Sequence, residues 1–575
     1  MFLRVTSRKN ADGSVVRYVA LAHNERVNGQ TRARVLVNLG REDTLDNDGL
    51  RRLVSSISRY LGDTDPYAGN GRGAADPLRV TSARSLGGVW LLDGLWHQLG
   101  IDAALRRLLG PRRFTTDVER VLFALVANRA LDPCSKLAAT EWVARDVAIT
   151  GLDGMSDDQA YRAMDLLVEA DATAQVQEAV FFSVANLLNL EVDVLLFDTT
   201  STYFERDTPD MTDDGDLGFR RYGHSKDHRS DLPQVIIGLA VTREGIPVRV
   251  WCWPGNTSDV TVLPEVRDGM RDWKLGRVVT VVDRGFSSNA NLDYLRRGGG
   301  HWIAGERMRD HAGDAAQALS RQGRFTVVND HLHVKEARLD STPGVRWIVC
   351  LNTAEAVKDK ATRDEALTRL QAELARIAEA RAKANAALKT TSSAKTRARL
   401  EAELAGHTRT ECALRDHVTL GRWLRQTSTG RLVIDRARIA AEAKLDGKYL
   451  LSTSDPHLTP AQVALGYKNL LEAERGFRDL KSTLLLRPVF HRLEPRIRAH
   501  VLICWLALLL VRVAENHTDT TWDRIARELD RLAAVTLTGP AGTVVQATEP
   551  TDLQRAFLRA CNVPVPPRIT TLNPR

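Results

Sequence analysis

The sequence predicts an α/β protein built around a mixed β-sheet. Short apolar runs of strand length occur at 192–198, 234–242, 247–253, 278–283 and 301–305. The first three runs are close enough for antiparallel pairing, and amphipathic stretches at about 259–272 and 287–297 can form the helical crossovers that later strands need. Three strands, a helix, a strand, a helix and a strand is the order of a ribonuclease-H-like core.

The N-terminal part precedes this core and divides into two segments. Residues 1–63 carry short apolar and polar runs between turn signals, which predicts a small β-rich segment. Residues 64–76 are Gly-rich and predict a linker. Residues 77–190 predict a helical domain, because 116–130 is amphipathic and 156–159 is a capping-box pattern. This domain either binds DNA or serves as a scaffold.

The predicted core has two parts, 191–305 and 456–515, separated by an insertion at 306–455. Within the insertion, strands are expected at 324–329, 332–338 and 346–351. Leucines and an isoleucine at 3-4 spacing then run from Leu367 to Leu388, with Arg381 breaking the stripe and polar residues 390–393 interrupting the helix. The pattern predicts a helical hairpin. Residues 516–575 predict a helical C-terminal tail, loosely ordered beyond 540 because of its prolines.

Composition limits the classes of protein. The 575 residues suffice for roughly three or four domains. Lys and Arg outnumber Asp and Glu by 80 to 72, a mild excess that fits a DNA partner without requiring one. Six scattered cysteines without a CxxC pair favour a reduced cytoplasmic protein over a zinc or disulfide scaffold. The chain opens on a strand-like segment instead of an apolar leader. The apolar run 501–513 is shorter than the ~20 residues of a membrane span, so we expect a core helix and no membrane partner.

Two aspartates end apolar runs that are expected to lie in one sheet. Asp198 follows Val192–Phe197 and Asp283 follows Val278–Val282. Each alone is typical of an ordinary strand end, but two adjacent carboxylates repel, and a divalent cation removes that conflict. Hard oxygen ligands favour Mg²⁺ or Mn²⁺, and two such ions ~4 Å apart can activate a water or a 3′-hydroxyl. The pair therefore predicts metal-dependent phosphoryl transfer on a nucleic acid.

A third carboxylate is expected on a helix from Pro460 to about Lys481, which begins with the capping residues Thr459 and Gln462. Helical spacing places four residues on one face: Tyr467, Glu474, Arg478 and Lys481. This favours Glu474 over Glu472 as a metal ligand, with cations beside it for a phosphate backbone. The alternative is an ordinary salt bridge between Glu474 and Arg478.

Several motifs together resemble a known family. They are Phe197–Ser201, Tyr222–Lys226, Pro254–Asp259, Val282–Phe286, Tyr467–Lys481, Leu486–His491 and Arg496–His500. The chain resembles bacterial insertion-sequence transposases of the IS4 superfamily, in its IS1634-like branch. The resemblance covers roughly 190–515 well and the N-terminal part more loosely.

The resemblance implies a catalytic DDE triad on Asp198, Asp283 and Glu474, which would bind two Mg²⁺ or Mn²⁺ ions. It also implies the signature Tyr-x2-Arg-x3-Glu-x6-Lys, in which Leu470 stands here where the family has Arg. The expected DNA contacts are Tyr467, Arg478, Lys481, His224, Lys226, Arg284 and Trp302. Trp302 is either a residue that stacks on a flipped base or a core tryptophan.

The function implied is transposition. The protein would bind the terminal inverted repeats of its element and target DNA, as a homodimer in a paired-end complex, and catalyse cleavage and strand transfer. Two alternatives stay open: a nuclease with the same core but no strand transfer, and a DNA-binding protein with a decayed catalytic core. All three acids are present, so the sequence gives no sign of decay.

Overall fold

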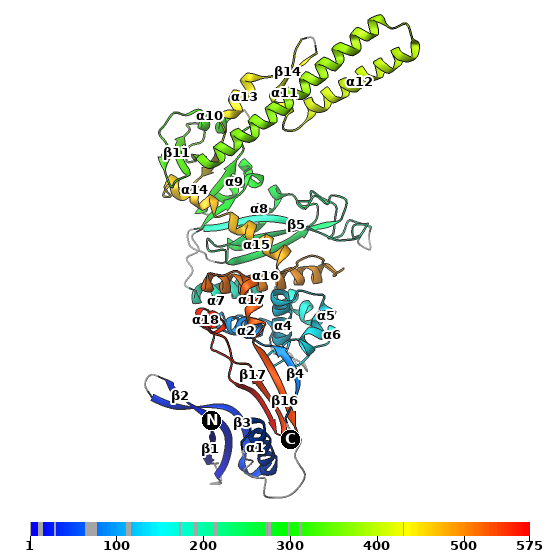
Figure 1. Ribbon diagram of the computed structural model, residues 1–575. Helices are drawn as coiled ribbons and strands as arrows, with labels where there is room; N and C mark the ends of the chain where they lie inside the picture. The colour runs from blue at the N-terminus through cyan, green and yellow to red at the C-terminus, as the bar shows by residue number, and fades with distance from the viewer. Residues whose placement is uncertain are drawn as a thin grey trace. The chain divides into compact units, whose positions relative to one another are not determined.

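The chain forms two compact units, which are described separately. The first unit comprises Met1–Ser258 with Leu471–Arg575, and the second comprises Asp259–Leu470. The computed structural model (Figure 1) describes residues 2–574 except 10–14, 28–29, 64–77, 111–116, 172–173, 189–193, 212–214, 272, 274–277, 297–298, 310–312 and 429. The predicted linker at 64–76 lies outside the described residues.

The first unit begins with an antiparallel sheet. Its strands are β1 (Phe2–Lys9), β2 (Val15–Val27) and β3 (Gln30–Arg41). The β-rich start is confirmed, but a helix that was not expected follows it, α1 (Asn47–Leu61). The Asp46 side chain caps this helix by accepting a hydrogen bond from the Gly49 amide at 2.8 Å.

The described residues between 87 and 187 of the first unit are mostly helical, as predicted. The helices are α2 (Gly87–Gln98), α3 (Ile101–Leu109), α4 (Val118–Leu131), α5 (Lys136–Arg145), α6 (Asp157–Ala170) and α7 (Gln175–Leu187). The capping box at Ser156 and Gln159 is present. The expectation that 116–130 is amphipathic was wrong, because α4 is buried on all sides from Glu119 to Ala130.

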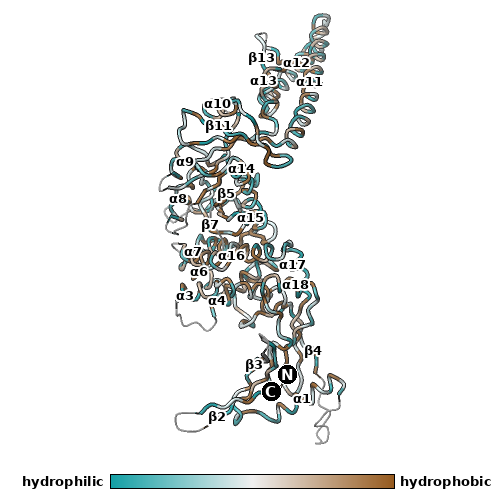
Figure 2. Tube along the Cα trace, turned by 90° about the vertical axis from the view of Figure 1, so that its left-hand side faces the viewer, coloured by the Kyte–Doolittle hydropathy of each residue, from teal (hydrophilic) through white to brown (hydrophobic). Residues whose placement is uncertain are grey.

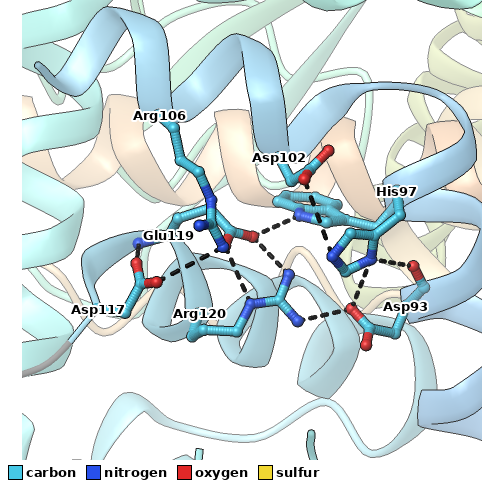
Figure 3. Close-up of polar contacts among 8 residues, drawn as sticks. Asp93, His97, Asp102, Arg106, Asp117, Glu119 and Arg120 are labelled. Carbon is cyan, nitrogen blue, oxygen red and sulfur yellow. Dashed lines mark hydrogen bonds and ion pairs between the residues drawn. The ribbon is translucent and has the colours of Figure 1, made fainter. Parts of the chain in front are cut away.

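Buried ion pairs explain how charged residues of α4 can lie inside. The Glu119 carboxylate accepts hydrogen bonds from Trp96 at 2.7 Å and from Arg106 and Arg120 at 2.5–3.0 Å (Figure 3). Arg120 also donates to Asp93 at 2.6 Å. Glu119 and Arg120 therefore each have a charged partner, which offsets the cost of removing them from water. Arg129, the other buried charge of α4, donates instead to the Leu484 and Leu485 carbonyls. Periodicity cannot show such pairing.

Helix α16 (Glu494–Thr518) lies at the centre of the first unit, where it contacts α4, α6, α15 and β7. Its hydrophobic residues are prominent in Figure 2. By length and composition alone it could cross a membrane, but 94% of its most apolar 18-residue stretch is buried inside the protein. The predicted core helix is therefore confirmed.

Three antiparallel strands of the first unit carry the first candidate acid. They are β5 (Val194–Tyr203), β6 (Gln234–Val241) and β7 (Pro247–Pro254), paired in that order. Helix α15 (Leu471–Ser482) packs on β5 and β6. The three predicted strands and their antiparallel pairing are confirmed.

The C-terminal residues differ from the predicted loose helical tail. They form α17 (Trp522–Leu529), β16 (Ala533–Gly539), β17 (Gly542–Ala547), α18 (Asp552–Ala560) and β18 (Ile569–Pro574). Strand β4 (Arg79–Ser85) completes an antiparallel sheet in the order β18-β17-β16-β4. Strands β16 and β17 form a local hairpin that the prediction missed, and β4, the other partner of β16, is supplied by a segment about 450 residues earlier in the chain.

The second unit contains a mixed sheet in the order β10-β11-β12-β15-β9-β8. Its strands are β8 (Val279–Val282), β9 (His301–Glu306), β10 (Thr326–Val327), β11 (Leu332–Arg338), β12 (Arg346–Asn352) and β15 (Lys448–Thr453). Strands β8 and β9 are parallel and joined through α9 (Asn289–Arg296), as a crossover requires. The other pairs are antiparallel.

The strands of the predicted insertion do not form a separate sheet. β15, which was not predicted, pairs with β12 on one side and β9 on the other, so it joins the insertion strands to the sheet of β8 and β9. The predicted hairpin is present as α11 (Thr353–Thr390) and α12 (Ala394–Asp416). The remaining elements are α8 (Asp259–Arg271), α10 (Asp314–Ser320), β13 (Leu424–Gln426), β14 (Leu432–Ile434), α13 (Arg436–Ala443) and α14 (Pro460–Lys468).

Candidate active site

Asp198 lies in the middle of strand β5, as the fifth of ten residues. Its predicted position at a strand end was wrong, because pairing with β6 continues to Tyr203 through a run of threonines and serine whose side chains suit a strand. Every other residue of β5 except Tyr203 is buried. The Asp198 side chain is 20% exposed, which marks it as the one carboxylate of this strand that a ligand can reach.

Lys226 holds a positive charge next to Asp198. Its ammonium group donates hydrogen bonds to the Thr199 carbonyl at 2.8 Å and the Thr199 hydroxyl at 2.7 Å. It lies 3.8 Å from Asp198 Oδ1, which also accepts a hydrogen bond from the Thr199 amide at 2.7 Å. The segment that carries Lys226 therefore lies beside the first acid. His224 is exposed in the same segment, and the DNA roles of both residues stay predictions.

Glu474 lies on α15, but not on the single helix that was predicted. The capping box at Thr459 and Gln462 is present, yet α14 ends at Lys468 and α15 begins at Leu471. Tyr467 and Glu474 therefore belong to different helices, and the argument that placed them on one face was wrong. Leu470 lies at the break between the two helices and is only 6% exposed. Helical periodicity therefore does not continue from Tyr467 to Glu474. Glu474, Arg478 and Lys481 remain together on α15.

Close packing holds α15 over the strand that carries Asp198. A Cβ atom on Gly476 would lie 2.8 Å from Leu239 Cδ2, so a larger residue at this position would require the Leu239 side chain to shift. Leu239 is paired with Asp198 across β5 and β6. Glu474, two residues before Gly476, is exposed.

The alternative for Glu474, a salt bridge with Arg478, is not seen among the described residues. Both side chains are exposed. Glu472 instead lies 3.9 Å from Arg475 and close to Gly245. Glu474 is thus the acid of this helix that is open to a ligand.

Asp227 connects three segments, although no role was predicted for it. Its carboxylate lies 2.8 Å from the Lys481 ammonium group and 3.0 Å from the Arg487 guanidinium group. Burial lowers the pKa of Lys481, while Asp227 acts in the opposite direction. Lys481 therefore ties α15 to the segment of Lys226. The position of Asp227 in the sequence was a signal for such a role, because this residue directly follows the Tyr222–Lys226 motif and Arg487 belongs to the Leu486–His491 motif.

Asp283 lies in the second unit at the end of β8, where it was predicted. It directly precedes a 3-10 helix at Arg284–Phe286, and its side chain is 47% exposed. Its Oδ1 atom accepts a hydrogen bond from the Tyr467 hydroxyl at 2.6 Å and lies 3.9 Å from Arg284 Nε. A Cβ atom on Gly305 would overlap the Tyr467 ring and hydroxyl, so this glycine leaves the space that Tyr467 occupies. Tyr467 is thereby positioned to orient Asp283.

We predict that Tyr467→Phe will lower the rate of DNA cleavage by about 10- to 100-fold. The change removes one hydrogen bond to a carboxylate, which contributes roughly 1.5–3 kcal/mol. Single-turnover cleavage of an end substrate measures the effect. Tyr449→Phe is the matched control, because Tyr449 stacks on Tyr467 but interacts with Cys350. Equal rates for the two variants would contradict the assigned positioning role.

Trp302 is a core residue. It is 1% exposed, and its indole nitrogen donates to Ser452 Oγ at 3.3 Å. The expectation that it stacks on a flipped base was wrong, because no base can reach a side chain buried in this way. The core alternative is the one observed.

Glu306 is a buried acid at the end of β9. Burial raises its pKa to about 7, and the hydrogen bond that Ser452 donates at 2.6 Å offsets this only in part. The pKa of Glu306 is higher in the folded protein than the value of about 4.5 in the unfolded chain. Its contribution to the free energy of unfolding is therefore fully present below pH ~4.5 and is lost as the pH rises through ~7. We predict that the unfolding free energy of wild type relative to Glu306→Gln will fall by up to about 3 kcal/mol between pH 5 and 8, as measured by urea denaturation. A constant difference would contradict the prediction.

The three acids supply donors that suit a hard divalent cation. All are carboxylates, and each is at least partly exposed. Asp198 and Glu474 belong to the first unit and Asp283 to the second. Among the described residues, no group of three His, Cys, Asp or Glu side chains is close enough to hold a metal ion. The six cysteines are free.

Comparison with known proteins identifies the family. A family model of the transposase DDE domain matches residues 192–510, more than half of the chain. The chain belongs to the DDE transposases. A model of the N-terminal domain of IS1634 family transposases matches residues 3–68, so this is an IS1634-like DDE transposase. It acts on DNA as a metal-dependent cleavage and transfer enzyme.

Among solved structures, the transposase is similar to one described as "Cryo-EM structure of piggyBac transposase synaptic complex with hairpin DNA (SNHP)". The identity is 10%, 76% of each chain is covered, and the TM-score is 0.33, a value too low to support an argument. No curated protein matches the chain.

Proposed function

We propose that this transposase mobilises an insertion sequence of the IS4 superfamily. It binds the terminal inverted repeats, cleaves the phosphodiester at each element end and joins the freed 3′-hydroxyl to target DNA. The observation that carries the proposal is the position of two aspartates inside the matched DDE region. Asp198 is partly exposed within an otherwise buried strand, and Asp283 is partly exposed where β8 ends. Such positions allow a carboxylate to reach a cation while its backbone stays fixed.

In this proposal Asp198, Asp283 and Glu474 would hold two Mg²⁺ or Mn²⁺ ions when DNA is bound; in this structure, no three acids of the described residues are close enough to do so. Bound ions of this kind supply an activated oxygen nucleophile and stabilise the leaving oxygen. Lys226 keeps a positive charge 3.8 Å from Asp198, which limits repulsion among the carboxylates. Tyr467 fixes the orientation of Asp283 through its 2.6 Å hydrogen bond.

The cations near these acids provide contacts to the DNA backbone. Arg478 is exposed one turn after Glu474, and Arg284 directly follows Asp283. His224 and Lys226 lie on the segment beside Asp198. Lys481 contributes indirectly, because its ammonium group is paired with Asp227. Phosphate contacts of this kind make DNA binding weaken as salt is raised.

A ribonuclease-H-like arrangement of the catalytic core fits this function. Antiparallel β5-β6-β7 in the first unit and the parallel β8-α9-β9 crossover in the second support it. The functional assembly would be a homodimer that pairs the two element ends in the cytoplasm.

Strand transfer from a pre-cut end tests the proposal. A labelled duplex that ends in a free 3′-hydroxyl is incubated with the protein, a target plasmid and Mg²⁺ or Mn²⁺. We expect labelled plasmid in which the 3′-hydroxyl is joined to target DNA. Cleavage of an uncut end without joining would show a nuclease, and tight binding without either reaction would show a decayed DNA-binding protein.

A further inference from the structure

Helices α11 and α12 of the second unit form a stiff arm. At 1.5 Å per residue, the 38 residues of α11 span about 57 Å from the end of β12 (Figure 1). Its four buried residues are spaced by seven: Arg363, Leu370, Ile377 and Ala384. This is the heptad spacing of helices that pack along a continuous seam.

Ion pairs fix the register of the arm. Arg381, which interrupts the apolar stripe, donates to Glu411 of α12 at 2.5 Å. Arg363 pairs with Asp446, near the base of the hairpin. A polar pair at a seam position favours one alignment of two helices over shifted ones. The turn between the helices is therefore held at a defined distance from the sheet.

The charge of the arm is concentrated at its turn. Residues 380–400 contain six Lys and Arg residues and no Asp or Glu. Residues 353–379 contain five Lys and Arg residues and six acids, and residues 401–416 contain two and four. The excess positive charge thus belongs to the turn and the helix ends beside it. We call residues 388–399 the arm tip.

Four cations of the arm tip are exposed: Lys389, Lys395, Arg397 and Arg399. Within the described part of the chain, none of them forms an ion pair with a carboxylate. Arg397 donates only a weak hydrogen bond to the Thr391 carbonyl, at 3.4 Å. By contrast, four cations along the helices lie within 4 Å of an acid one turn away: Lys358, Arg369, Arg376 and Lys383.

Helix stability does not explain three of the four cations of the tip; only Lys389, in the last turn of α11, is favoured by the helix dipole. Ser393 caps the N-terminus of α12, so Lys395 and Arg397 lie in its first turns, where the helix dipole disfavours positive charge. Lys395 and Arg399 are four residues apart, and like charges at this spacing also destabilise a helix. The tip therefore carries charges that oppose its own folding, which favours a role in binding.

We propose that the arm tip is a second DNA-binding surface, which contacts the phosphate backbone of duplex DNA. The proposal rests on the proposed function only in taking duplex DNA as the ligand. Four consecutive hydroxyl residues, 390–393, add donors for phosphate oxygens. The tip lacks aromatic residues, Asn and Gln, so it is suited neither to the apolar centre of a protein interface nor to reading adenine edges.

The salt dependence of binding tests the proposal with two matched variants. The tip variant changes Lys389, Lys395, Arg397 and Arg399 to Ala. The control variant changes Lys358, Arg369, Arg376 and Lys383 to Ala. It therefore removes equal numbers of lysines and arginines, two of each, but from positions that are paired with acids. Circular dichroism confirms that both variants keep the helical content of wild type.

Fluorescence anisotropy then measures affinity for a duplex long enough to extend well beyond an element end, at 50–300 mM salt. We expect the tip variant to bind on the order of 100-fold more weakly near 0.15 M salt. Four lost phosphate contacts should also reduce the slope of log K against log salt by about 3 to 4. The control variant should keep the slope and affinity of wild type.

Equal slopes for the tip and control variants would overturn the proposal. Retained DNA affinity with a loss of dimer, seen by light scattering, would also overturn it and assign the tip to a second copy of the chain. The outcome is separable from that of the proposed function. Suppose that the tip variant has a smaller slope of log K against log salt than wild type, but that wild type joins no ends to target DNA. This result would refute strand transfer and leave the assignment of the arm tip intact.

Discussion

The Asp198→Asn variant will bind an element end as tightly as wild type and cleave it on the order of 10³-fold more slowly in Mg²⁺ or Mn²⁺. The substitution keeps the shape of the side chain but removes the charge that holds a hard cation. Losing several kcal/mol of transition-state stabilisation has an effect of this size. A labelled end substrate under single-turnover conditions measures both binding and cleavage.

Asp231→Asn is the control for this variant. Asp231 lies in the connection that leads from β5 to β6, is 63% exposed and pairs with Arg229 at 2.9 Å. It should leave cleavage unchanged. Equal activity of the Asp198 variant and wild type would remove Asp198 from the site.

The largest expected effect on stability is that of Arg512→Ala. Arg512 is 1% exposed within α16 and lies 2.7 Å from Asp479 and 2.9 Å from Glu515. Burial raises the pKa of Asp479, and Arg512 acts against it. Removing the cation leaves two carboxylates without their buried partner, which costs about 3–5 kcal/mol. Urea denaturation of the full-length protein will show this loss as a lower free energy of unfolding.

An exposed ion pair gives the contrast. Arg527 pairs with Asp523, and both side chains are more than 70% exposed. Arg527→Ala should change the unfolding free energy by no more than about 1 kcal/mol. If both arginine variants are equally stable, the buried network of α16 does not contribute as described.

Sequence periodicity was sufficient for elements whose pattern is local. The strands at β5, β6, β7, β8 and β9 and the α11–α12 hairpin follow from alternation, apolar runs and 3-4 spacing. Pairing between distant segments was not visible. β15 enters the sheet between β12 and β9, and β4 pairs with β16, so each has a partner that is far away in the sequence.

The two aspartates were found because both follow apolar runs that were expected to lie in one sheet, and Glu474 was found by helical spacing. Their surroundings were harder to predict. The break at Leu470 separates Tyr467 from the helix of Glu474, and the Tyr467 hydroxyl contacts Asp283 instead. Lys481 is occupied by Asp227, and Trp302 is buried. These outcomes depend on side-chain packing between elements, which residue spacing does not encode.

Metal binding by the three carboxylates is the central claim, and Mn²⁺ titration followed by electron paramagnetic resonance tests it most directly. Wild type, Asp198→Asn, Asp283→Asn and Glu474→Gln are each titrated in the presence of an element-end duplex. The account predicts two bound ions in wild type and at least tenfold weaker binding of one or both ions in every variant. Unchanged Mn²⁺ binding in all three variants would contradict it.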